Sequence, residues 1–427
     1  MTLATLNSRP LLVVSASTPR LRIALLGYRS NPFSGGQGIY IKYVARALRD
    51  VGHQVDVISG EPYPELDDGV KLIKLPGLNL YAQADPFKAF KLSHFRSLTD
   101  LFEWTSVASG GFPEPYTFGR RVFSYLRAHR NDYDIIHDNQ SLSHGITALQ
   151  GLGLPVVSTI HHPITFDRDI ALAHTSDWGM RLLIRRWHHF LKMQTKVARR
   201  LRHIVTVSES SKRDICTAFN VSHDRVTVIY NGVDTTIFKP LADVQRLERQ
   251  LITTASADQP LKGTQHLIPA FAKLRELYPD LRLTFIGKPK PGGDTANLIE
   301  KLGVSEAIDF IHGISSTEIA RLYAKATIAV VPSEYEGFGL PAAEAMACGV
   351  PVVATDGGAL PEVLGSAGIT VEKANVEALY QGMAKLLENP ELRARLSVEG
   401  RSRMHQHFNW EQVAQRLTSY YQQVINS

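Results

Sequence analysis

The sequence predicts an α/β protein built from two doubly wound domains, each with a parallel sheet at its centre. Short apolar runs rich in β-branched residues recur along the chain, and each is followed by a polar turn and a stretch with helical spacing. The length of 427 residues, 44% of them hydrophobic, is enough for two domains with a core each. We therefore expect two Rossmann-like units.

Twelve apolar runs are the expected strands, and they fall into two series. The first series is RIALLG from Arg22, QVDVIS from Gln54, YDIIHD from Tyr133, PVVSTIHH from Pro155, HIVTVS from His203 and RVTVIYNG from Arg225. The second is QLITTAS from Gln250, RLTFIG from Arg282, IDFIHG from Ile308, IAVVPS from Ile328, PVVAT from Pro351 and GITVE from Gly368. Each series is long enough for one sheet.

A turn-rich stretch from Asn231 to Val244, containing Gly232 and Pro240, separates the two series and predicts an interdomain hinge. Apolar side chains at helical spacing near the carboxyl terminus predict a packing helix. The expected division is a flexible leader at residues 1–20, a first domain at 21–235, a second domain at 236–403, and a helix at 404–427 that packs back toward the first domain.

Composition limits the classes of partner. With 47 Lys and Arg against 41 Asp and Glu, the net charge is +6, which favours phosphates, nucleotides or an anionic membrane face but is too diffuse to indicate nucleic-acid binding. The two cysteines, Cys216 and Cys348, provide neither a disulfide framework nor a cysteine zinc site. No apolar run approaches the ~20 residues of a membrane span. We expect a cytoplasmic protein.

The first glycine-rich loop follows the strand that ends at Gly27. It contains Gly35, Gly36 and Gly38 and leads into a helix, so its backbone N–H groups can approach a phosphate. The alternative is that these glycines serve only a tight turn. The dinucleotide pattern G-x-G-x-x-G is not met, because Ile41 stands where the third glycine belongs, and no Walker-type loop is present.

A second and more specific stretch runs from Val331 to Val363. Glu336 lies at the end of a buried strand, and Glu344 lies one turn into the following helix, so both carboxylates can face one pocket. The free backbone N–H groups at the start of that helix belong to Phe338, Gly339 and Leu340. Carboxylates accept hydrogen bonds from sugar hydroxyls and exposed amides hold phosphate oxygens, so this pattern suits a sugar diphosphate.

The run EGFGLP, with two glutamates separated by seven residues and followed by AMACGVPVV, resembles the signature of family 4 of the retaining glycosyltransferases. Supporting pieces lie in the expected order: SGGQG at Ser34, STIHH at Ser158, TVSES at Thr206, YNGVD at Tyr230 and LKG at Leu261. The resemblance covers nearly the whole chain from Leu21. It implies the GT-B fold, in which two Rossmann-like domains face each other across a cleft, the first on the acceptor side and the second holding a nucleotide-sugar donor.

Residue roles follow from the same resemblance. Glu336 resembles the acid that contacts the donor sugar, Lys262 the cation on the diphosphate, and His161 the histidine at the reaction centre; these three are the expected catalytic residues. His162 points to the other face of an extended strand. Glu344 resembles the acid that binds the ribose. The other expected donor contacts are Gly35, Gly36, Ser256, Phe338, Gly339, Leu340 and Asn231.

One departure from the family concerns the diphosphate. Most relatives have Gly-Arg before the lysine, whereas this chain has Ser256 and Ala257 there, so the second cation is missing. Either Arg29, Lys288 or Lys290 replaces it, or the site relies on Lys262, Ser256 and the helix amides.

The expected reaction moves a hexose from a UDP or GDP sugar to an acceptor hydroxyl with retention at the anomeric carbon, as the resemblance implies. No carboxylate has an obvious nucleophile role, so we favour a same-face transfer in which the leaving diphosphate helps to deprotonate the acceptor. No D-x-D motif lies in the donor region, so we expect no metal and no cofactor; the nucleotide sugar is a co-substrate.

The acceptor side is less informative. Residues 181–203 hold eight Arg or Lys and no acid among interspersed apolar residues, which fits either a peripheral contact with an anionic membrane, on its inner face, or a solvated face over the core. The irregular segment from Asp85 to Tyr125 is expected to be an acceptor-side excursion. The acceptor itself is not specified by the sequence.

Three rival classes remain open: a nicotinamide-dependent oxidoreductase, a non-catalytic sugar-nucleotide sensor, and a sugar-nucleotide epimerase of the same fold. The unmet dinucleotide pattern argues against the first. A sensor would tend to have lost Glu336, His161 or Lys262, and all three are present. Detection of free epimerised donor, without an acceptor product, would identify the epimerase.

Overall fold

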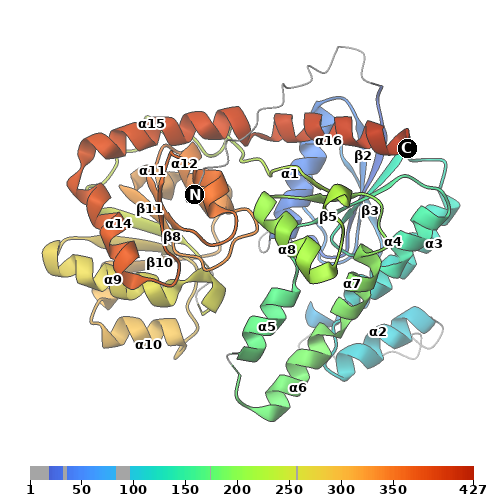
Figure 1. Cartoon of the computed structure of the whole chain (residues 1–427), viewed down its shortest axis with the longest axis horizontal. Helices are drawn as coiled ribbons and strands as arrows, with labels where there is room; N and C mark the ends of the chain where they lie inside the picture. The colour runs from blue at the N-terminus through green and yellow to red at the C-terminus, as the bar shows by residue number, and fades with distance from the viewer. Residues whose placement is uncertain (1–18, 32–35, 83–96, 174, 256–257) are drawn as a thin grey trace.

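The computed structural model describes residues 19–31, 36–82, 97–173, 175–255 and 258–427. Two parallel sheets lie side by side, each covered by helices on both faces (Figure 1). Each of the twelve predicted runs contains a strand. The two-domain α/β prediction is therefore confirmed.

The first sheet has seven strands in the order β3-β2-β1-β4-β5-β6-β7, and every neighbouring pair is parallel. Its strands are β1 (Arg22–Gly27), β2 (Gln54–Ser59), β3 (Lys71–Lys74), β4 (Ile135–Asn139), β5 (Val156–Ile160), β6 (Ile204–Thr206) and β7 (Val226–Val228). Its helices are α1 (Gly36–Asp50), α2 (Leu98–Ala108), α3 (Glu114–Ala128), α4 (His144–Gly151), α5 (Thr165–Ala173), α6 (Trp178–Trp187), α7 (Leu191–Ala198) and α8 (Glu209–Phe219).

The second sheet has six parallel strands in the order β10-β9-β8-β11-β12-β13. They are β8 (Gln250–Thr254), β9 (Arg282–Ile286), β10 (Ile308–Ile311), β11 (Ile328–Val331), β12 (Val352–Thr355) and β13 (Ile369–Val371). The remaining helices are α9 (Thr264–Leu277), α10 (Asp294–Lys301), α11 (Ser316–Lys325), α12 (Leu340–Ala347), α13 (Leu360–Leu364), α14 (Val376–Glu388), α15 (Pro390–His407) and α16 (Trp410–Ile425).

Strand β3 was not predicted. Its four residues, KLIK, begin and end with an exposed lysine, and it pairs only with β2 at the edge of the sheet. Edge strands carry such charges because a charged edge resists pairing with other chains. The apolar signal that identifies a buried parallel strand is therefore missing from this one.

The chain crosses between the domains twice, and the two crossings lie side by side. The backbone N–H of Val233 donates to the carbonyl oxygen of Phe408 at 2.7 Å, and Val233 bridges to Asn409. A Cβ on Gly232 would lie 2.7 Å from the backbone nitrogen of Trp410, so only glycine permits this approach. The boundary expected at residues 235 and 236 falls between the two sheets.

The last helix packs on the first domain (Figure 1). Asn409 caps α16 by accepting a hydrogen bond from Gln412, so this helix starts at Trp410, and residues 404–407 belong to α15 instead of the expected terminal helix. Trp410 stacks on Tyr43 of α1 with ring centroids 5.5 Å apart. Tyr421 of α16 is fully buried in the first-domain core.

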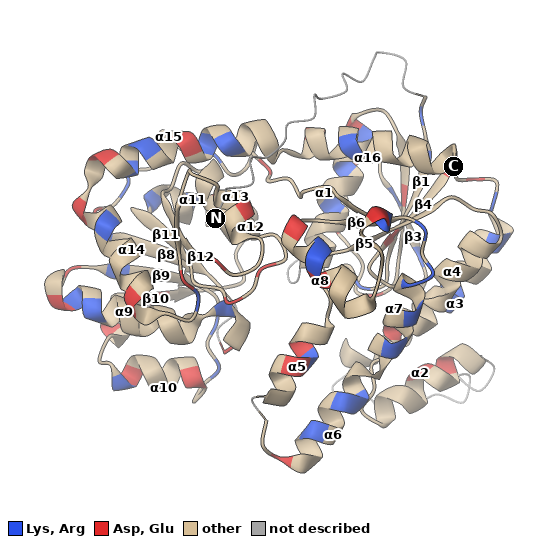
Figure 2. Cartoon of the chain, in the orientation of Figure 1, with Lys and Arg blue, Asp and Glu red and all other residues tan. Residues whose placement is uncertain are grey.

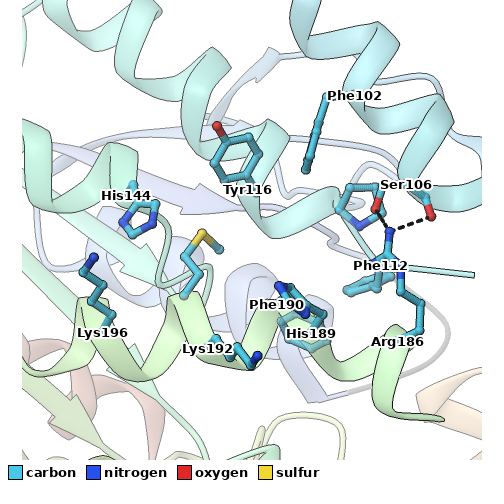
Figure 3. A pocket seen from close by; sticks show the side chains of 12 residues that line it. Phe102, Ser106, Phe112, Tyr116, His144, Arg186, His189, Phe190, Lys192 and Lys196 are labelled. Carbon is cyan, nitrogen blue, oxygen red and sulfur yellow. Dashed lines mark hydrogen bonds between the residues drawn. The ribbon is translucent and has the colours of Figure 1, made fainter. Parts of the chain in front are cut away.

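Helices α5 and α6 project from the first domain (Figure 1), and neither contains a buried residue. Lys and Arg residues recur along α6 and α7, as the blue segments of the ribbon show in Figure 2. Beside them a cavity of about 550 Å³ lies among α2, α3, α7 and the turn of His188–Phe190 that precedes α7 (Figure 3). We call it the aromatic pocket. Its walls include α2 and α3, the described part of the expected Asp85–Tyr125 excursion; residues 85–96 lie outside the described chain.

Candidate active site

The stretch from Val331 to Glu344, which we call the glutamate corner, connects β11 to α12. Glu336 lies in it, and its Oε1 accepts hydrogen bonds from Nζ of Lys262 and from Oγ of Ser333, each at 2.8 Å. The Glu336 side chain is 12% exposed and that of Lys262 is 28% exposed. The structure therefore brings together, in a largely buried ion pair, two residues that are 74 positions apart in sequence.

Glycines make this corner possible. Gly263, which follows Lys262, has φ +66°, and a Cβ there would lie 1.8 Å from the carbonyl oxygen of Pro332. Gly358 has φ +64°, and a Cβ there would lie 2.2 Å from the carbonyl oxygen of Glu336. Both contacts exclude any side chain, so two loops from distant parts of the sequence pack backbone to backbone around the ion pair.

The first turn of α12 presents backbone donors. Within the described residues, the N–H groups of Phe338, Gly339 and Leu340 donate no hydrogen bond to the protein. The side chain of Phe338 itself is 5% exposed and packs on Phe408, with ring centroids 5.7 Å apart. Phe338 thus anchors the turn in the core, and only its backbone is available to a ligand.

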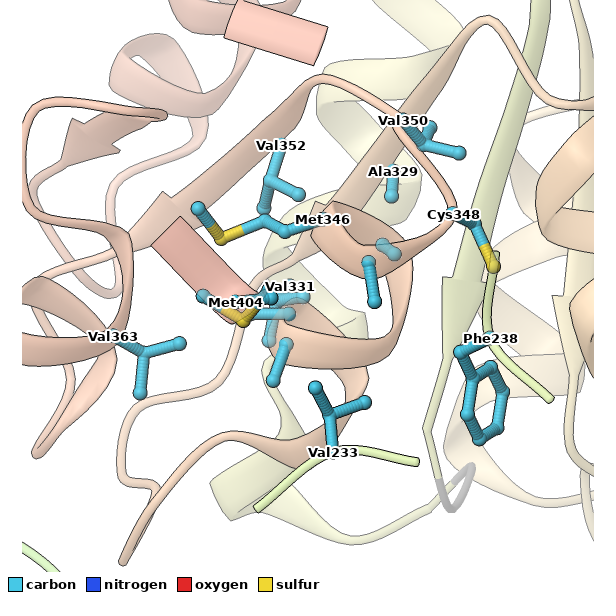
Figure 4. Close-up of a cluster of buried hydrophobic side chains, with 14 of the residues drawn as sticks. Val233, Phe238, Ala329, Val331, Met346, Cys348, Val350, Val352, Val363 and Met404 are labelled. Carbon is cyan, nitrogen blue, oxygen red and sulfur yellow. The ribbon is translucent and has the colours of Figure 1, made fainter. Parts of the chain in front are cut away.

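Behind the corner, α12 is held by a tightly packed apolar cluster, part of which appears in Figure 4. The cluster contains Met346 and Cys348, and burial raises the pKa of the Cys348 thiol to about 12. This thiol is therefore a core side chain. A packed cluster of this kind keeps the glutamate corner rigid.

Glu344 differs from Glu336. It faces the side of α12 near Tyr43 and Tyr323, whose pKa values its negative charge helps to raise. No described cation pairs with it, and burial raises the pKa of its carboxyl to about 8. Both expected carboxylates therefore lie on the same corner, but only Glu336 has its charge compensated.

On the first-domain side, His161 follows β5. Its Nε2 lies 2.7 Å from Oδ1 of Asn139, and the Asn139 amide nitrogen donates to the carbonyl oxygen of Gln37 at 3.1 Å. Because the Asn139 amide is oriented by Gln37, its oxygen faces the imidazole, and Nε2 of His161 carries the hydrogen. Nδ1 keeps its lone pair. Burial, with smaller contributions from His162 and His137, lowers the pKa of His161 to about 3.

His161 is held by its backbone as well. Its N–H donates to Oε1 of Gln140 at 2.7 Å, and the Gln140 amide donates to the carbonyl oxygen of His162. The Tyr40 ring lies edge-on to the imidazole at 4.8 Å. His162 points elsewhere and binds Asp167 at 3.1 Å, which agrees with the alternation expected at the strand end.

The two sides touch at this point. A Cβ on Gly337 would lie 3.0 Å from the carbonyl oxygen of His161, and the Gly337 carbonyl accepts hydrogen bonds from the hydroxyls of Ser208 and Ser211 at 2.7 and 3.1 Å. Glu362 of α13 accepts from the first backbone N–H groups of α8. The glutamate corner and the end of β5 therefore form one site.

The first glycine loop has two kinds of glycine. A Cβ on Gly38 would lie 2.0 Å from the carbonyl oxygen of Asn31, so this glycine is required for packing. A Cβ on Gly36, the first residue of α1, would meet no atom of a described residue within 4 Å. The tight-turn explanation thus suits Gly38, whereas no packing contact with the described chain requires a glycine at position 36. Gly35 lies outside the described residues.

The other residues expected to contact the donor differ in burial and in their hydrogen-bond partners. Asn231 is 7% exposed, and its buried side-chain oxygen has no hydrogen-bond partner within the described chain. Arg29 is held by both carboxylate oxygens of Glu114 at 2.9 and 3.0 Å, so it is engaged on the first domain. Lys288 and Lys290 are exposed. Ser256 and Ala257 lie outside the described residues.

Sequence reasoning missed three partners of the predicted residues: Ser333, Asn139 and Glu362. Ser333 and Asn139 both stand at the carboxyl ends of predicted strands, where ligand-binding residues collect in this fold class. That position was the available signal. No local sequence pattern identifies Glu362, because its partners on α8 are about 150 residues away in the sequence.

Two further features are absent from the described part of the chain. It contains no group of three or more His, Cys, Asp or Glu side chains arranged to hold a metal ion. It also contains no helix long and apolar enough to cross a membrane.

Two parallel-sheet domains that meet where Gly337 contacts the end of β5, beside a paired acid and lysine, match the GT-B fold of glycosyltransferases. Two family descriptions match the chain: Glycosyltransferase Family 4 over residues 34–237 and Glycosyl transferases group 1 over residues 242–403. The protein belongs to glycosyltransferase family 4, and the resemblance predicted from its motifs is confirmed.

Among curated relatives, the MMP α-(1→4)-mannosyltransferase of Mycolicibacterium hassiacum is 43% identical over 409 residues, which cover 95% of this chain and 98% of the relative. The D-inositol 3-phosphate glycosyltransferase of Acidothermus cellulolyticus is 27% identical and covers 96% of this chain and 91% of the relative. The chain is thus similar over most of its length to sugar-transferring enzymes, and we assign it as a glycosyltransferase.

Solved structures show the same fold. Sucrose-phosphate synthase from Thermosynechococcus elongatus superposes with a TM-score of 0.72 at 22% identity, covering 95% of this chain and all (100%) of that one. The Anabaena protein HepE, solved in complex with UDP and glucose, gives a TM-score of 0.69 at 17% identity, covering 95% of this chain and 100% of that one. At these identities the likeness concerns the fold alone.

Proposed function

We propose that this glycosyltransferase moves a hexose, with mannose as the first candidate, from a UDP or GDP sugar to an acceptor hydroxyl with retention at the anomeric carbon. The observation that carries the proposal is the Lys262–Glu336 pair beside the unpaired amides of α12 and next to His161. The choice of mannose follows the 43% identical mannosyltransferase. The nucleotide is proposed because HepE was solved with UDP.

In this proposal the donor diphosphate lies against the first turn of α12, where unpaired N–H groups and the helix field favour an anion. Lys262 exchanges Glu336 for a phosphate oxygen when the donor binds, and the freed Glu336 carboxylate accepts hydrogen bonds from sugar hydroxyls. Ser333 keeps Glu336 oriented through this exchange. Glu344 binds the ribose, and Gly36 backs the diphosphate from α1.

Charge develops on the leaving diphosphate as the glycosidic bond breaks, and the same oxygen then takes the proton of the acceptor hydroxyl on that face of the sugar. Lys262 and the amides of Gly339 and Leu340 stabilise this charge. His161 is neutral, so it adds no positive charge near the oxocarbenium-like centre, and its Nδ1 lone pair can accept a hydrogen bond from a sugar hydroxyl. Catalysis is mainly positioning. We propose that no metal takes part.

The test combines binding and transfer. A thermal-shift screen with UDP, GDP and ADP sugars identifies the donor, because a ligand that binds only the native state raises Tm. Product analysis with that donor then reports anomeric configuration, and a chelator is added in parallel. An inverted product contradicts the retaining mechanism, and activity that is lost with chelator and restored by magnesium contradicts the metal-free one.

Two rivals are separated in the same assay. An epimerase releases free epimerised donor without any acceptor product, and a sugar-nucleotide sensor binds donor without turnover. The full-length similarity to a mannosyltransferase favours transfer over both.

We further propose that the enzyme is cytoplasmic and contacts the anionic inner face of the membrane through residues 181–203. Leu182 and Leu183 of α6 are exposed beside Arg185, on a helix that buries no residue. Apolar and basic groups together suit an anionic bilayer surface. Co-sedimentation with anionic vesicles that is lost at high salt supports this contact, and no binding at low salt contradicts it.

A further inference from the structure

The aromatic pocket lies on the first domain, and no residue of the glutamate corner lines it (Figure 3). Its apolar wall is made by Phe102 and Tyr116, whose rings lie 4.9 Å apart, and by Phe112, Phe190 and Met193. Phe112 packs against the rings of Trp187 and Phe190, with centroids 5.0 and 5.2 Å apart. Ring packing therefore supports this part of the wall, and a volume of about 550 Å³ is in the range of a ligand site.

The rim of the pocket is basic. Lys192 and Lys196 lie one helical turn apart on α7, on the same face as Met193, and Arg186 and His144 complete the rim. No described carboxylate pairs with either lysine, and none of the described lining residues is acidic. Lys196 and Arg200 also contribute, after burial, to lowering the pKa of His144, so the positive potential here is uncompensated.

The side chains that line the pocket differ from those that recognise sugar hydroxyls. Sites that read sugar hydroxyls use carboxylate and amide side chains, which can accept and donate in pairs. Among the described residues that line the pocket there is no Asp, Glu, Asn or Gln. Ser106 and Tyr116 offer hydroxyls, and that of Ser106 already accepts a hydrogen bond from Arg186 at 3.2 Å. An apolar hollow with a cationic rim instead matches a ligand that has an apolar part and an anionic part.

The pocket is connected to the reaction centre through one buried side chain. The amide of Gln194, which lies on α7 and is fully buried, donates to the carbonyl oxygens of Gln140 and Ser141 at 3.3 and 3.2 Å. Gln140 in turn accepts from the backbone N–H of His161. The helix that carries the two rim lysines is thus tied to the residue expected at the transferred sugar.

We infer that the aromatic pocket binds a single amphiphilic anion, a hydrocarbon chain that ends in a phosphate or carboxylate. The chain lies on the rings of Phe112, Tyr116 and Phe190, and the anion lies between Lys192 and Lys196. The ligand enters as one molecule from solution. The identification of this ligand as the non-reacting end of the acceptor rests on the proposed function. Its binding to the pocket does not depend on that function.

The experiment measures binding of butyl and octyl phosphate to the whole protein by calorimetry, below the concentration at which octyl phosphate forms micelles. Octyl phosphate is expected to bind more tightly than butyl phosphate, by up to about fourfold for each methylene that becomes buried. The variant Lys192→Glu/Lys196→Glu is expected to weaken binding at least about tenfold by replacing attraction with repulsion. The control Lys385→Glu, at an exposed lysine on α14 of the other domain, should leave binding unchanged.

Three results would overturn the inference. Inorganic phosphate that binds as tightly as octyl phosphate would reduce the site to surface charge. Octyl maltoside that binds equally well would remove the role of the lysines. Binding to anionic vesicles without binding to the monomeric probe would assign the basic residues to a membrane surface. None of these measurements uses sugar transfer, so a failure of the proposed function leaves the pocket result intact, and the reverse also holds.

Discussion

The glutamate corner and the aromatic pocket both contain lysine side chains, but the lysine charge is paired with a carboxylate in the corner and is unpaired in the pocket. In the corner, Lys262 is paired with Glu336 at 2.8 Å, and glycines bring two loops into backbone contact around the pair. In the pocket, Lys192 and Lys196 have no described carboxylate partner, and the walls are aromatic. The corner is arranged to exchange one ionic partner for another, whereas the pocket holds positive charge that only a ligand can neutralise.

The largest effect is expected from breaking the compensated pair. Lys262→Ala or Glu336→Ala leaves a largely buried charge without its partner and removes a group proposed to act on the donor, so kcat/KM should fall about 10²–10³-fold. Steady-state kinetics with the identified donor measures this.

The double variant sharpens the result. Because the two residues are in contact, the loss in Lys262→Ala/Glu336→Ala should be smaller than the product of the single losses. A near-normal rate in a single variant would remove the replaced residue from the mechanism.

A second and smaller effect concerns His161, on the first-domain side of the site. Asn139→Asp replaces a neutral partner by a carboxylate, which stabilises the imidazolium and raises the pKa of His161 from about 3. The wild-type profile should show no His161 titration between pH 5 and 8 (a range set by the usual histidine values). The variant should lose about tenfold in rate at the acidic end and regain it as the pH rises.

The pH dependence of the rate distinguishes a role of Asn139 in orienting His161 from a purely structural role. Asn139→Leu removes the hydrogen bond without adding charge, so its rate loss should be independent of pH. A variant Asn139→Asp whose rate falls equally at every pH would mean that the pair has only a structural role.

The corner could be predicted from the sequence and the pocket could not, for a physical reason. A close backbone approach requires glycine, and a helix start beside a strand end leaves few choices of residue, so the corner is encoded in one short run that ends with Glu344. The pocket is assembled from Phe102, Tyr116 and Met193 on three separate helices, and aromatic residues at helical spacing look the same whether they line a hollow or fill a core.

The pairing of Lys262 with Glu336 shows the same limit on a smaller scale. The motifs placed both residues in the site, but the hydrogen bond between them depends on how two loops meet, which local pattern does not specify. Strand β3 was missed because its alternation is too short and too charged, whereas the buried strands of both sheets were found because parallel strands are apolar on both faces.

A third prediction compares the two acids of the corner. Burial raises the pKa of Glu344 to about 8, from 4.5 for an unperturbed glutamate. The folded protein therefore binds more protons than the unfolded chain between these values, and the stability contributed by the proton is lost as the pH rises toward 8. Glu344→Gln does not titrate, so its Tm should rise relative to wild type from pH 5 to pH 8 (both inside the window set by linkage).

The control for Glu344→Gln is Glu276→Gln, an exposed acid on α9, which should follow wild type at every pH. Nucleotide binding gives an independent readout. If the Glu344 carboxylate binds the ribose, affinity for the nucleotide should increase with pH toward 8 in the wild type and stay level in Glu344→Gln. A level profile in both proteins would remove Glu344 from the donor site.

The smallest effect is expected where the two domains are joined, away from the pair and the pocket. Glu362 caps α8 by accepting from the backbone N–H groups of Glu209 and Ser210 at 2.8 and 2.7 Å, and it also accepts from the Tyr230 hydroxyl at 3.1 Å. Glu362→Ala should lower stability by about 1 kcal/mol, the usual cost of losing a cap, which differential scanning calorimetry reports as a small fall in Tm.

Since Glu362 touches neither the aromatic pocket nor Lys262, the kcat of Glu362→Ala should change far less than that of Lys262→Ala. A comparable loss of kcat would mean that the contact between α8 and α13 sets the geometry of the corner, so that the charge exchange at Lys262 depends on how the domains are held together.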